Sequence, residues 1–330
     1  MRNKKKTAIF IVIILLAVVV AFLFGGTTKT KKSAEVTIEE GTGSRQIADI
    51  LKKEGVIGSQ MSFLVKLKLS EYDGKLQYGT YHIEEGMEMN ELFEMLATEG
   101  AKVNTVNITI PEGYTAEMIG AKLEEKGLFT KKEFLEAVST KEGYEFEWLS
   151  DIEEKEGRKY FLQGYLYPDT YNVYKSATPQ EVVALMLSNF EKHYAEVETD
   201  QSMDRIVTLA SVIERETSVS SERSTIAGVI ENRLDKGMRL QIDPTALYPL
   251  TDGMYNKTKV TYEDLKIDSP YNTYRNKGLP VGPICNPSVE CMKAAAQPEE
   301  HEYLYYHTKS ENSKEHDFYK TYEEHINSQK

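Results

Sequence analysis

Two stretches of the sequence, VTIEEGTGSRQIADILKKEGVI (residues 36–57) and ITIPEGYTAEMIGAKLEEKGLF (residues 108–129), align without a gap and decide the expected fold. Each begins as a short strand, turns at a glycine and continues with apolar residues at helical spacing. The identical pairs are Thr37/Thr109, Ile38/Ile110, Glu40/Glu112, Gly41/Gly113, Ile47/Ile119, Leu51/Leu123 and Gly55/Gly127. YHIEEGMEMNELFEML (residues 81–96) repeats the pattern in part. Two full copies are too few for a solenoid, so we expect small strand–helix modules placed side by side.

The composition of the 330-residue chain supports folded domains. Hydrophobic residues make up 40% of the chain and aromatic residues 10%, which is enough to form cores. The formal net charge is −12, and no basic cluster with interleaved aromatic residues follows the N-terminus. Such a surface repels a nucleic-acid backbone. We therefore expect two or three compact units and no nucleic-acid partner.

The N-terminus contains an uncharged apolar stretch, TAIFIVIILLAVVVAFLF (residues 7–24). At about 1.5 Å per residue, a helix of this length just spans a hydrocarbon core of about 30 Å. Four basic residues within 1–6 favour a cytoplasmic N-terminus, and three lysines between positions 29 and 32 weaken that bias without reversing it. GGTTKTKK, which follows, offers no cleavage site of the small-x-small kind. We expect an uncleaved signal anchor, in a single-pass protein of the cell membrane whose remainder lies outside the cytoplasm.

A helix is predicted over MDRIVTLASVIERET (residues 203–217). With about 100° per residue, the centre of its apolar face runs from Ile206 to Ile213. Glu216 falls beside this centre and Glu214 falls on the opposite flank. Residues two apart do not share a helix face, so the two glutamates cannot act together on the same bond of a substrate.

The apolar surroundings distinguish these two glutamates. A carboxyl beside apolar neighbours has its ionised form disfavoured, so its pKa rises toward the range of a proton donor. Of the two glutamates, Glu216 is therefore the better candidate for a catalytic acid. The alternative is an ordinary surface helix that ends in charged residues.

The segments that follow indicate a cleft built on loops. SSERSTIAGVIENRLDKG (residues 220–237) predicts a helix with a serine N-cap and a glycine stop. MRLQID (residues 238–243) alternates apolar and polar residues, which predicts a half-buried strand or ribbon. Further on, amides, tyrosines and Pro/Gly turns are dense. FLQGYLYPDTYNVY (residues 161–174) is aromatic-rich and suits either sugar rings or, our preferred interpretation, a core.

The cysteine and histidine content predicts neither a metal nor a cofactor. Cys285 and Cys291 can form a disulfide outside the cytoplasm, or they can be two small buried residues. The six histidines include no HExxH pair, and no metal pattern uses the cysteines.

A series of motifs resembles the MltG or YceG-like family of endolytic murein transglycosylases over nearly the whole chain. The motifs, in order, are LxGYLYPDTY, ASVIERET, SERSTIAGVIENRL, LQIDPT, SPYNTY, GLPVGPICNPS, AAAQP and YLYY. In that family the catalytic acid is the second glutamate of the ExET motif, which corresponds to Glu216. Gln163, Cys285 and Glu315 depart from the family pattern, and these departures leave the roles of Gln163 and His316 open.

The resemblance implies an α+β fold with an N-terminal transmembrane helix, a small LysM-like α/β module and a mixed α+β catalytic domain. LysM units are associated with glycan binding, and a mere spacer role is the alternative. The expected boundaries are 1–6 (cytoplasmic tail), 7–24 (signal anchor), 25–35 (linker), 36–105 (LysM-like module), 106–200 (second strand–helix repeat and connecting region) and 201–330 (catalytic core).

The resemblance also implies a reaction that needs one carboxylate. The family cuts the bond between N-acetylmuramic acid and N-acetylglucosamine within glycan strands, and the muramyl 6-hydroxyl attacks its own anomeric carbon to leave a 1,6-anhydro end. An ordinary glycosidase needs two carboxylates. Here the acid that protonates the leaving oxygen can afterwards take the hydroxyl proton, and the internal nucleophile gains from proximity.

Other residues are expected to position the sugar or to orient Glu216, although each also suits a structural role. They are Thr217, Asn232, Gln241, Asp243, Thr245, Tyr271, Asn272 and Thr273. Glu214 is expected to bond neighbouring backbone or Arg233. Arg233 suits, alternatively, a carboxylate of a peptide stem.

Two other functions remain open from the sequence. A two-carboxylate glycoside hydrolase would pair Glu216 with Asp243 or Glu222, and a non-catalytic adaptor would only bind peptidoglycan at the membrane. The partners implied are peptidoglycan glycan strands, the membrane and, because the family works beside them, peptidoglycan synthases.

Overall fold

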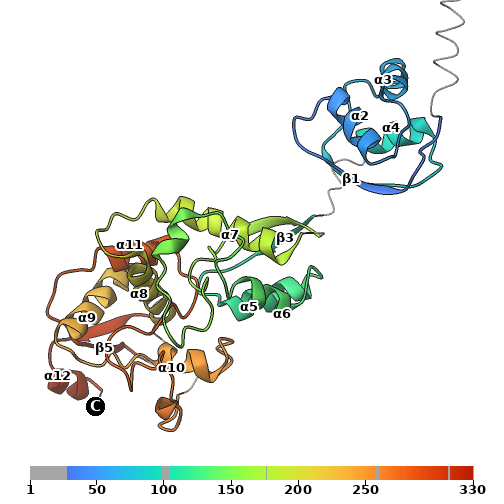
Figure 1. The fold of residues 1–330 in the computed structure, drawn as a ribbon. Coiled ribbons are helices and arrows are strands. Elements are labelled where there is room, and N and C mark those ends of the chain that lie inside the picture. The colour runs from blue at the N-terminus through green and yellow to red at the C-terminus, as the bar shows by residue number, and fades with distance from the viewer. Residues whose placement is uncertain (1–27, 99–104, 176, 258–259, 311–312, 330) are drawn as a thin grey trace, which may run out of the picture. The chain divides into compact units, whose positions relative to one another are not determined.

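The computed structural model describes residues 28–98, 105–175, 177–257, 260–310 and 313–329. The chain divides into two compact units, one up to Thr105 and one from Val106, which are described separately (Figure 1). The expected anchor, residues 7–24, lies outside the described residues. Among the residues that are described, no helix is both long and apolar enough to cross a membrane.

The first unit packs three helices around an antiparallel pair of strands. Its elements are β1 (Ala34–Ile38), α2 (Ser44–Lys53), α3 (Gln60–Leu69), β2 (Gly79–Ile83) and α4 (Met89–Thr98). Val36 lies opposite Tyr81 in the strand pair. Both are buried with apolar residues of all three helices, among them Leu51, Phe63 and Leu92. The unit therefore has a hydrophobic core of its own.

The second unit is a mixed α+β structure in which helices predominate. It contains β3 (Thr105–Thr109), α5 (Ala116–Glu125), α6 (Lys131–Ala137), η1 (Glu147–Asp151), β4 (Thr170–Tyr174), α7 (Pro179–Tyr194), α8 (Met203–Glu216), η2 (Ser220–Glu222), α9 (Arg223–Asp235), α10 (Asp243–Leu250), η3 (Asp264–Lys266), α11 (Val289–Ala296), β5 (Tyr305–Thr308), β6 (His316–Tyr319) and α12 (Tyr322–Asn327), where η denotes a 3-10 helix. β3 pairs with β4, and β5 pairs with β6. The fold class is α+β, as the sequence predicts.

The internal repeat extends further than the sequence indicates. Both copies have the order strand, helix, helix, strand, because β1–α2–α3–β2 corresponds to β3–α5–α6–β4. The turns of both copies use a glycine in the left-handed region, Gly41 with φ 82° and Gly113 with φ 75°.

The side chains between the paired strands repeat as well. The hydroxyl oxygens of Thr37 and Thr80 lie 3.0 Å apart, and those of Thr109 and Thr170 lie 2.9 Å apart. The β2–α4 and β4–α7 segments thus complete two versions of one module, although their sequences are too different to align at sight.

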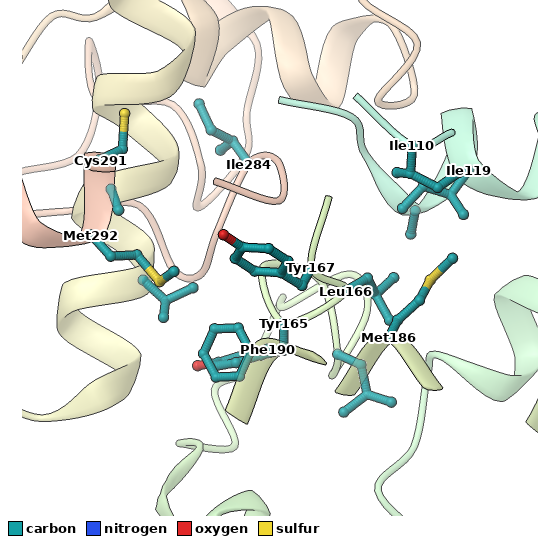
Figure 2. Close-up of a cluster of buried hydrophobic side chains, with 14 of the residues drawn as sticks. Ile110, Ile119, Tyr165, Leu166, Tyr167, Met186, Phe190, Ile284, Cys291 and Met292 are labelled. Atoms are coloured by element: carbon teal, nitrogen blue, oxygen red, sulfur yellow. The ribbon is translucent and has the colours of Figure 1, made fainter. Parts of the chain in front are cut away.

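One hydrophobic core joins the regions 106–200 and 201–330. Figure 2 shows Ile110 and Ile119 of the second repeat, the stretch from Tyr165 to Tyr167, and Met292 of α11 in the same cluster. The stretch lies within residues 161–174, so the core interpretation of that aromatic segment is confirmed. Because the core is shared, residues 201–330 do not form a separate hydrophobic core.

The two cysteines are free and buried, so the second of the two sequence interpretations holds. Cys285 packs against α8, where its thiol lies 3.3 Å from the carbonyl oxygen of Ser211. Burial raises the pKa of both thiols.

Two local predictions are wrong. Residues 238–243 form no strand, because Gln241 has φ 53° and breaks the extended conformation. The expected alternation survives in the burial of Leu240 and Ile242 on either side of exposed Gln241. Helix α9 begins at Arg223 after a 3-10 turn, with Glu222 at its N-cap position and without a side-chain cap. The serines before it lie in that turn.

Two glycines offer a matched test of the core. Gly164 has φ 100°, and an added Cβ would lie 2.5 Å from Cγ of Pro283 and 2.8 Å from Cγ1 of Val207. Gly278 has φ 88° with open space around it. Gly278→Ala should cost only the strain of a left-handed alanine, about 1–2 kcal/mol. Gly164→Ala should cost about 1–3 kcal/mol more through overpacking. Urea denaturation measures both, and equal losses would contradict this packing.

Candidate active site

Helix α8 carries the predicted acid to the edge of the core. Ser202 caps it by accepting a hydrogen bond from the backbone N–H of Arg205, and every residue from Ile206 to Ile213 is buried. The helix ends at Glu216, and Thr217 continues in extended conformation. The last turn of a buried helix thus presents the Glu216 carboxyl.

Glu216 lies in the wall of a cavity of about 520 Å³. The cavity is formed by the end of α8, by α9, by the irregular segment before α10, by β5 and by the C-terminal helix α12. Its lining residues are Glu216, Val229, Ile230, Arg233, Leu240, Gln241, Ile242, Asp243, Tyr274, Tyr305, Tyr306, His307, Tyr322, His325 and Gln329.

The surroundings of Glu216 suit a proton donor. Burial raises its pKa above the ordinary value, and the negative charge of Asp243 acts in the same direction. The Tyr306 hydroxyl donates a hydrogen bond to Oε2 of Glu216 at 2.5 Å and opposes the rise in pKa, as do the charges of His316 and Arg233. The pKa remains raised because desolvation is the largest of these effects.

Glu214 points elsewhere, as the helix geometry predicts. Its Oε2 accepts hydrogen bonds from the backbone N–H of Ser288 at 2.9 Å and from the Ser288 hydroxyl at 2.6 Å. Its Oε1 lies 4.0 Å from the guanidinium of Arg223. Glu214 therefore fastens the start of α11 to α8, and its arginine partner is Arg223 rather than Arg233.

Three of the other predicted residues reach the cavity, namely Arg233, Gln241 and Asp243. Asp243 accepts a hydrogen bond from the Tyr274 hydroxyl at 2.6 Å. Arg233 donates from Nε to the carbonyl oxygen of Leu304 and from Nη1 to that of Leu240, and burial lowers its pKa. These bonds fix the guanidinium in the cavity wall.

Thr245 and Thr273 lie behind the cavity wall and hold it in place. Their hydroxyl oxygens lie 2.8 Å apart, and the Thr273 hydroxyl accepts a hydrogen bond from the backbone N–H of Ile242 at 3.1 Å. The carbonyl of Thr273 accepts one from Gln241. The two threonines thus set the unusual backbone of Gln241.

The remaining predicted residues also have structural partners. Asn232 donates to the carbonyl oxygens of His301 and Tyr303, and Asn272 donates to those of Leu265 and Ile267. Tyr271 accepts a hydrogen bond from the backbone of Lys159, and Thr217 accepts one from that of Val219. These side chains support loops around the cavity and do not line it.

The structure assigns contacts to Gln163 and His316, whose roles the sequence leaves open. Gln163 is buried and accepts a hydrogen bond from the backbone N–H of Ala116, at the start of α5. His316 lies 2.8 Å from Glu222, which also accepts a hydrogen bond from the His316 backbone. Glu222 is thereby engaged away from the lining of the cavity.

Sequence reasoning missed several residues of the cavity, above all Tyr306. The YLYY motif drew attention to this segment, but only the strand β5 shows which of its tyrosines faces Glu216. Tyr322 and His325 of α12 carried no sequence signal at all. In the part of the chain that the structure describes, no cluster of histidine, cysteine and acidic residues could hold a metal ion.

Comparisons with known proteins agree on one family. The model of the YceG-like family matches residues 36–330. An endolytic murein transglycosylase of Bacillus subtilis (strain 168) is 34% identical over 294 residues, which cover 85% of this chain and 80% of that protein. An endolytic murein transglycosylase of Streptococcus pneumoniae (strain D39) is 30% identical and matches 84% of this chain, which spans only 54% of that relative.

A solved structure is similar as well. The crystal structure of a putative YceG-like protein from Listeria monocytogenes superposes with a TM-score of 0.58 at 31% identity. The match covers 90% of this chain and 99% of the other.

The raised pKa of Glu216 predicts that the acid costs stability. Between its ordinary pKa and its raised native pKa, the native protein holds a proton that the unfolded chain has lost, so stability falls as the pH rises through this window. Glu216→Gln removes this loss. As the pH rises from about 4.5, the free energy of unfolding of the variant should therefore increase relative to that of the wild type. The increase is about 1.4 kcal/mol for each tenfold difference between the proton affinities of Glu216 in the native and the unfolded state. Urea titrations at several pH values measure it. Exposed Glu300 is the control, and a stability difference for Glu216→Gln that does not change with pH would contradict the burial.

Proposed function

The chain belongs to the YceG-like family, and on this basis we propose that it is an endolytic murein transglycosylase with Glu216 as its catalytic residue. One observation carries the assignment of the residue. Glu216 is a carboxyl with a raised pKa at the end of a buried helix, and it opens into a cavity of about 520 Å³.

The proposed reaction uses this carboxyl twice. Protonated Glu216 gives its proton to the oxygen that joins N-acetylmuramic acid to N-acetylglucosamine, and the bond from the anomeric carbon to that oxygen breaks. The 6-hydroxyl of the same muramyl residue forms the new bond to the anomeric carbon and loses its proton to the Glu216 carboxylate. The enzyme returns to its protonated state, and the products are a new N-acetylglucosamine end and a 1,6-anhydro end.

The two opposing influences on Glu216 suit these two steps. Desolvation favours the protonated form that the first step needs. The Tyr306 hydroxyl and the charge of Arg233 favour the carboxylate that the first step creates. Tyr306 and Arg233 therefore reduce the free-energy cost of ionising Glu216, while its pKa stays raised enough for it to act as an acid.

A two-carboxylate hydrolase is the second candidate, because Asp243 shares the cavity wall with Glu216. In that mechanism Asp243 would activate a water molecule or attack the sugar. Glu222, the other acid considered from the sequence, is bonded to His316 and is less suited to this role.

We propose in addition that residues 7–24 anchor the chain in the cell membrane, with the N-terminus in the cytoplasm and the catalytic unit outside. The support is the uncharged apolar stretch and the basic residues before it. Peptidoglycan lies on that outer side. The first unit would act there as a LysM-like glycan-binding module or as a spacer, and peptidoglycan synthases are the expected protein partners.

Glu216→Gln should lower the rate of cleavage of purified glycan strands at least about 100-fold, as expected for loss of a general acid–base. Mass spectrometry of the wild-type products should show 1,6-anhydro ends. Asp243→Asn provides the comparison and should retain most of the activity. Reducing ends, together with an equal loss in Asp243→Asn, would favour the hydrolase. Unchanged cleavage by Glu216→Gln would reject the assignment of the acid.

Tyr306→Phe should move the pH profile of kcat/KM. Loss of the hydrogen bond removes an influence that lowers the pKa of Glu216, so the acid keeps its proton to higher pH. The limb on which kcat/KM falls with rising pH should shift upward. Tyr305→Phe is the matched control, since Tyr305 lines the same cavity but its neighbour provides the bond to Glu216. Identical profiles for the two variants would exclude this role for Tyr306.

A further inference from the structure

Helix α3 of the first unit carries apolar side chains on two opposite faces. Phe63 and Leu67 are buried in the core of the unit. On the outer face, Met61 is 58% exposed and Leu69 is 72% exposed. Large apolar side chains gathered on one exposed face of a helix commonly mark an interaction site. We therefore expect the outer face of α3 to contact a partner.

The exposed side chains form a stripe along the helix. Met61, Val65 and Leu69 follow one another at intervals of four residues, which places them on one side of an α-helix. Val65 is partly exposed between its two more exposed neighbours. We call these three residues the α3 stripe.

One end of the α3 stripe lies close to the point where the described chain begins. Thr28, Leu69 and Tyr72 line the same cavity, which has a volume of about 670 Å³. Thr28 is held to the unit, because its carbonyl oxygen accepts a hydrogen bond from the backbone N–H of Met89 at 2.9 Å. Lys29, the next residue, pairs with Glu88 at 3.0 Å.

The sequence between the apolar stretch and this fixed point is very short. Phe24 ends the apolar stretch, and only Gly25, Gly26 and Thr27 separate it from Thr28. Whatever conformation they take, four residue steps reach at most about 14 Å. The polar headgroup region of each leaflet is about 5–8 Å thick. An anchor at residues 7–24 thus holds Thr28, and the cavity it shares with Leu69, at the surface of the bilayer.

We propose that the α3 stripe docks into the interface of the lipid bilayer, so that the first unit lies on the membrane. The inference rests on the proposed anchor and is independent of the proposed reaction. Apolar side chains on one face of a helix are suited to the boundary between headgroups and acyl chains. Three such side chains bind weakly by themselves, but the anchor makes the contact intramolecular and raises the effective concentration of the membrane surface.

The test uses the full chain, reconstituted into vesicles whose acyl chains carry bromine as a fluorescence quencher. A fluorophore is attached to a cysteine introduced at position 61 or 69. Labelling of the unchanged protein gives the background from Cys285 and Cys291, which are buried. Glu40→Cys is the matched control, because Glu40 is an exposed residue of the same unit at the far end of β1 from the anchor.

Labels at positions 61 and 69 should lose most of their fluorescence in brominated vesicles, whereas a label at position 40 should not. Equal and weak quenching at all three positions would overturn the docking. Alkaline carbonate washing of the vesicles tests the anchor separately. Release of the protein would overturn the anchor and with it the docking, while the role of Glu216 is judged by its own substitution.

Discussion

The chemistry proposed for the second unit depends on one carboxyl group kept partly out of water. Glu216 stands at the last residue of α8, where apolar surroundings raise its pKa and the Tyr306 hydroxyl, at 2.5 Å, holds it in place. Without the apolar setting the acid would be ionised before substrate arrived. Without the hydroxyl, the carboxylate left after proton transfer would lack a donor. The end of α8, strand β5 and the cavity together place Glu216 between these two opposing influences on its pKa.

Much of the surrounding polar network serves to fix main chain. Asn286 is the clearest case, since its side chain accepts hydrogen bonds from Gly164 and Leu166 and donates one to the carbonyl of Tyr114. It ties the second repeat to the segment before α11. Glu214 fastens the end of that segment to α8 through Ser288. Many polar residues near an active site thus act on substrate only through the backbone they hold.

Whether a feature could be predicted from the sequence depends on how far apart in the chain its interacting residues lie. Helical period alone separates Glu216 from Glu214, because that separation is local. The roles of Thr245 and Thr273 depend on a contact across 28 residues, and no local pattern reveals that they are buried. Tyr306 and α12 reach the cavity through tertiary packing, which no local sequence pattern predicts. Residues 238–243 kept the burial pattern of a strand but not its backbone, because Gln241 adopts a left-handed conformation.

The two copies of the repeated module differ in the burial of their glycine turns. In the second copy, the turn at Gly113 is buried and exchanges backbone hydrogen bonds with Asn286. In the first copy, the corresponding turn at Gly41 is exposed. The exposed turn of the N-terminal copy can therefore accept neighbouring substitutions that, in the second copy, would disturb the backbone bonded to Asn286.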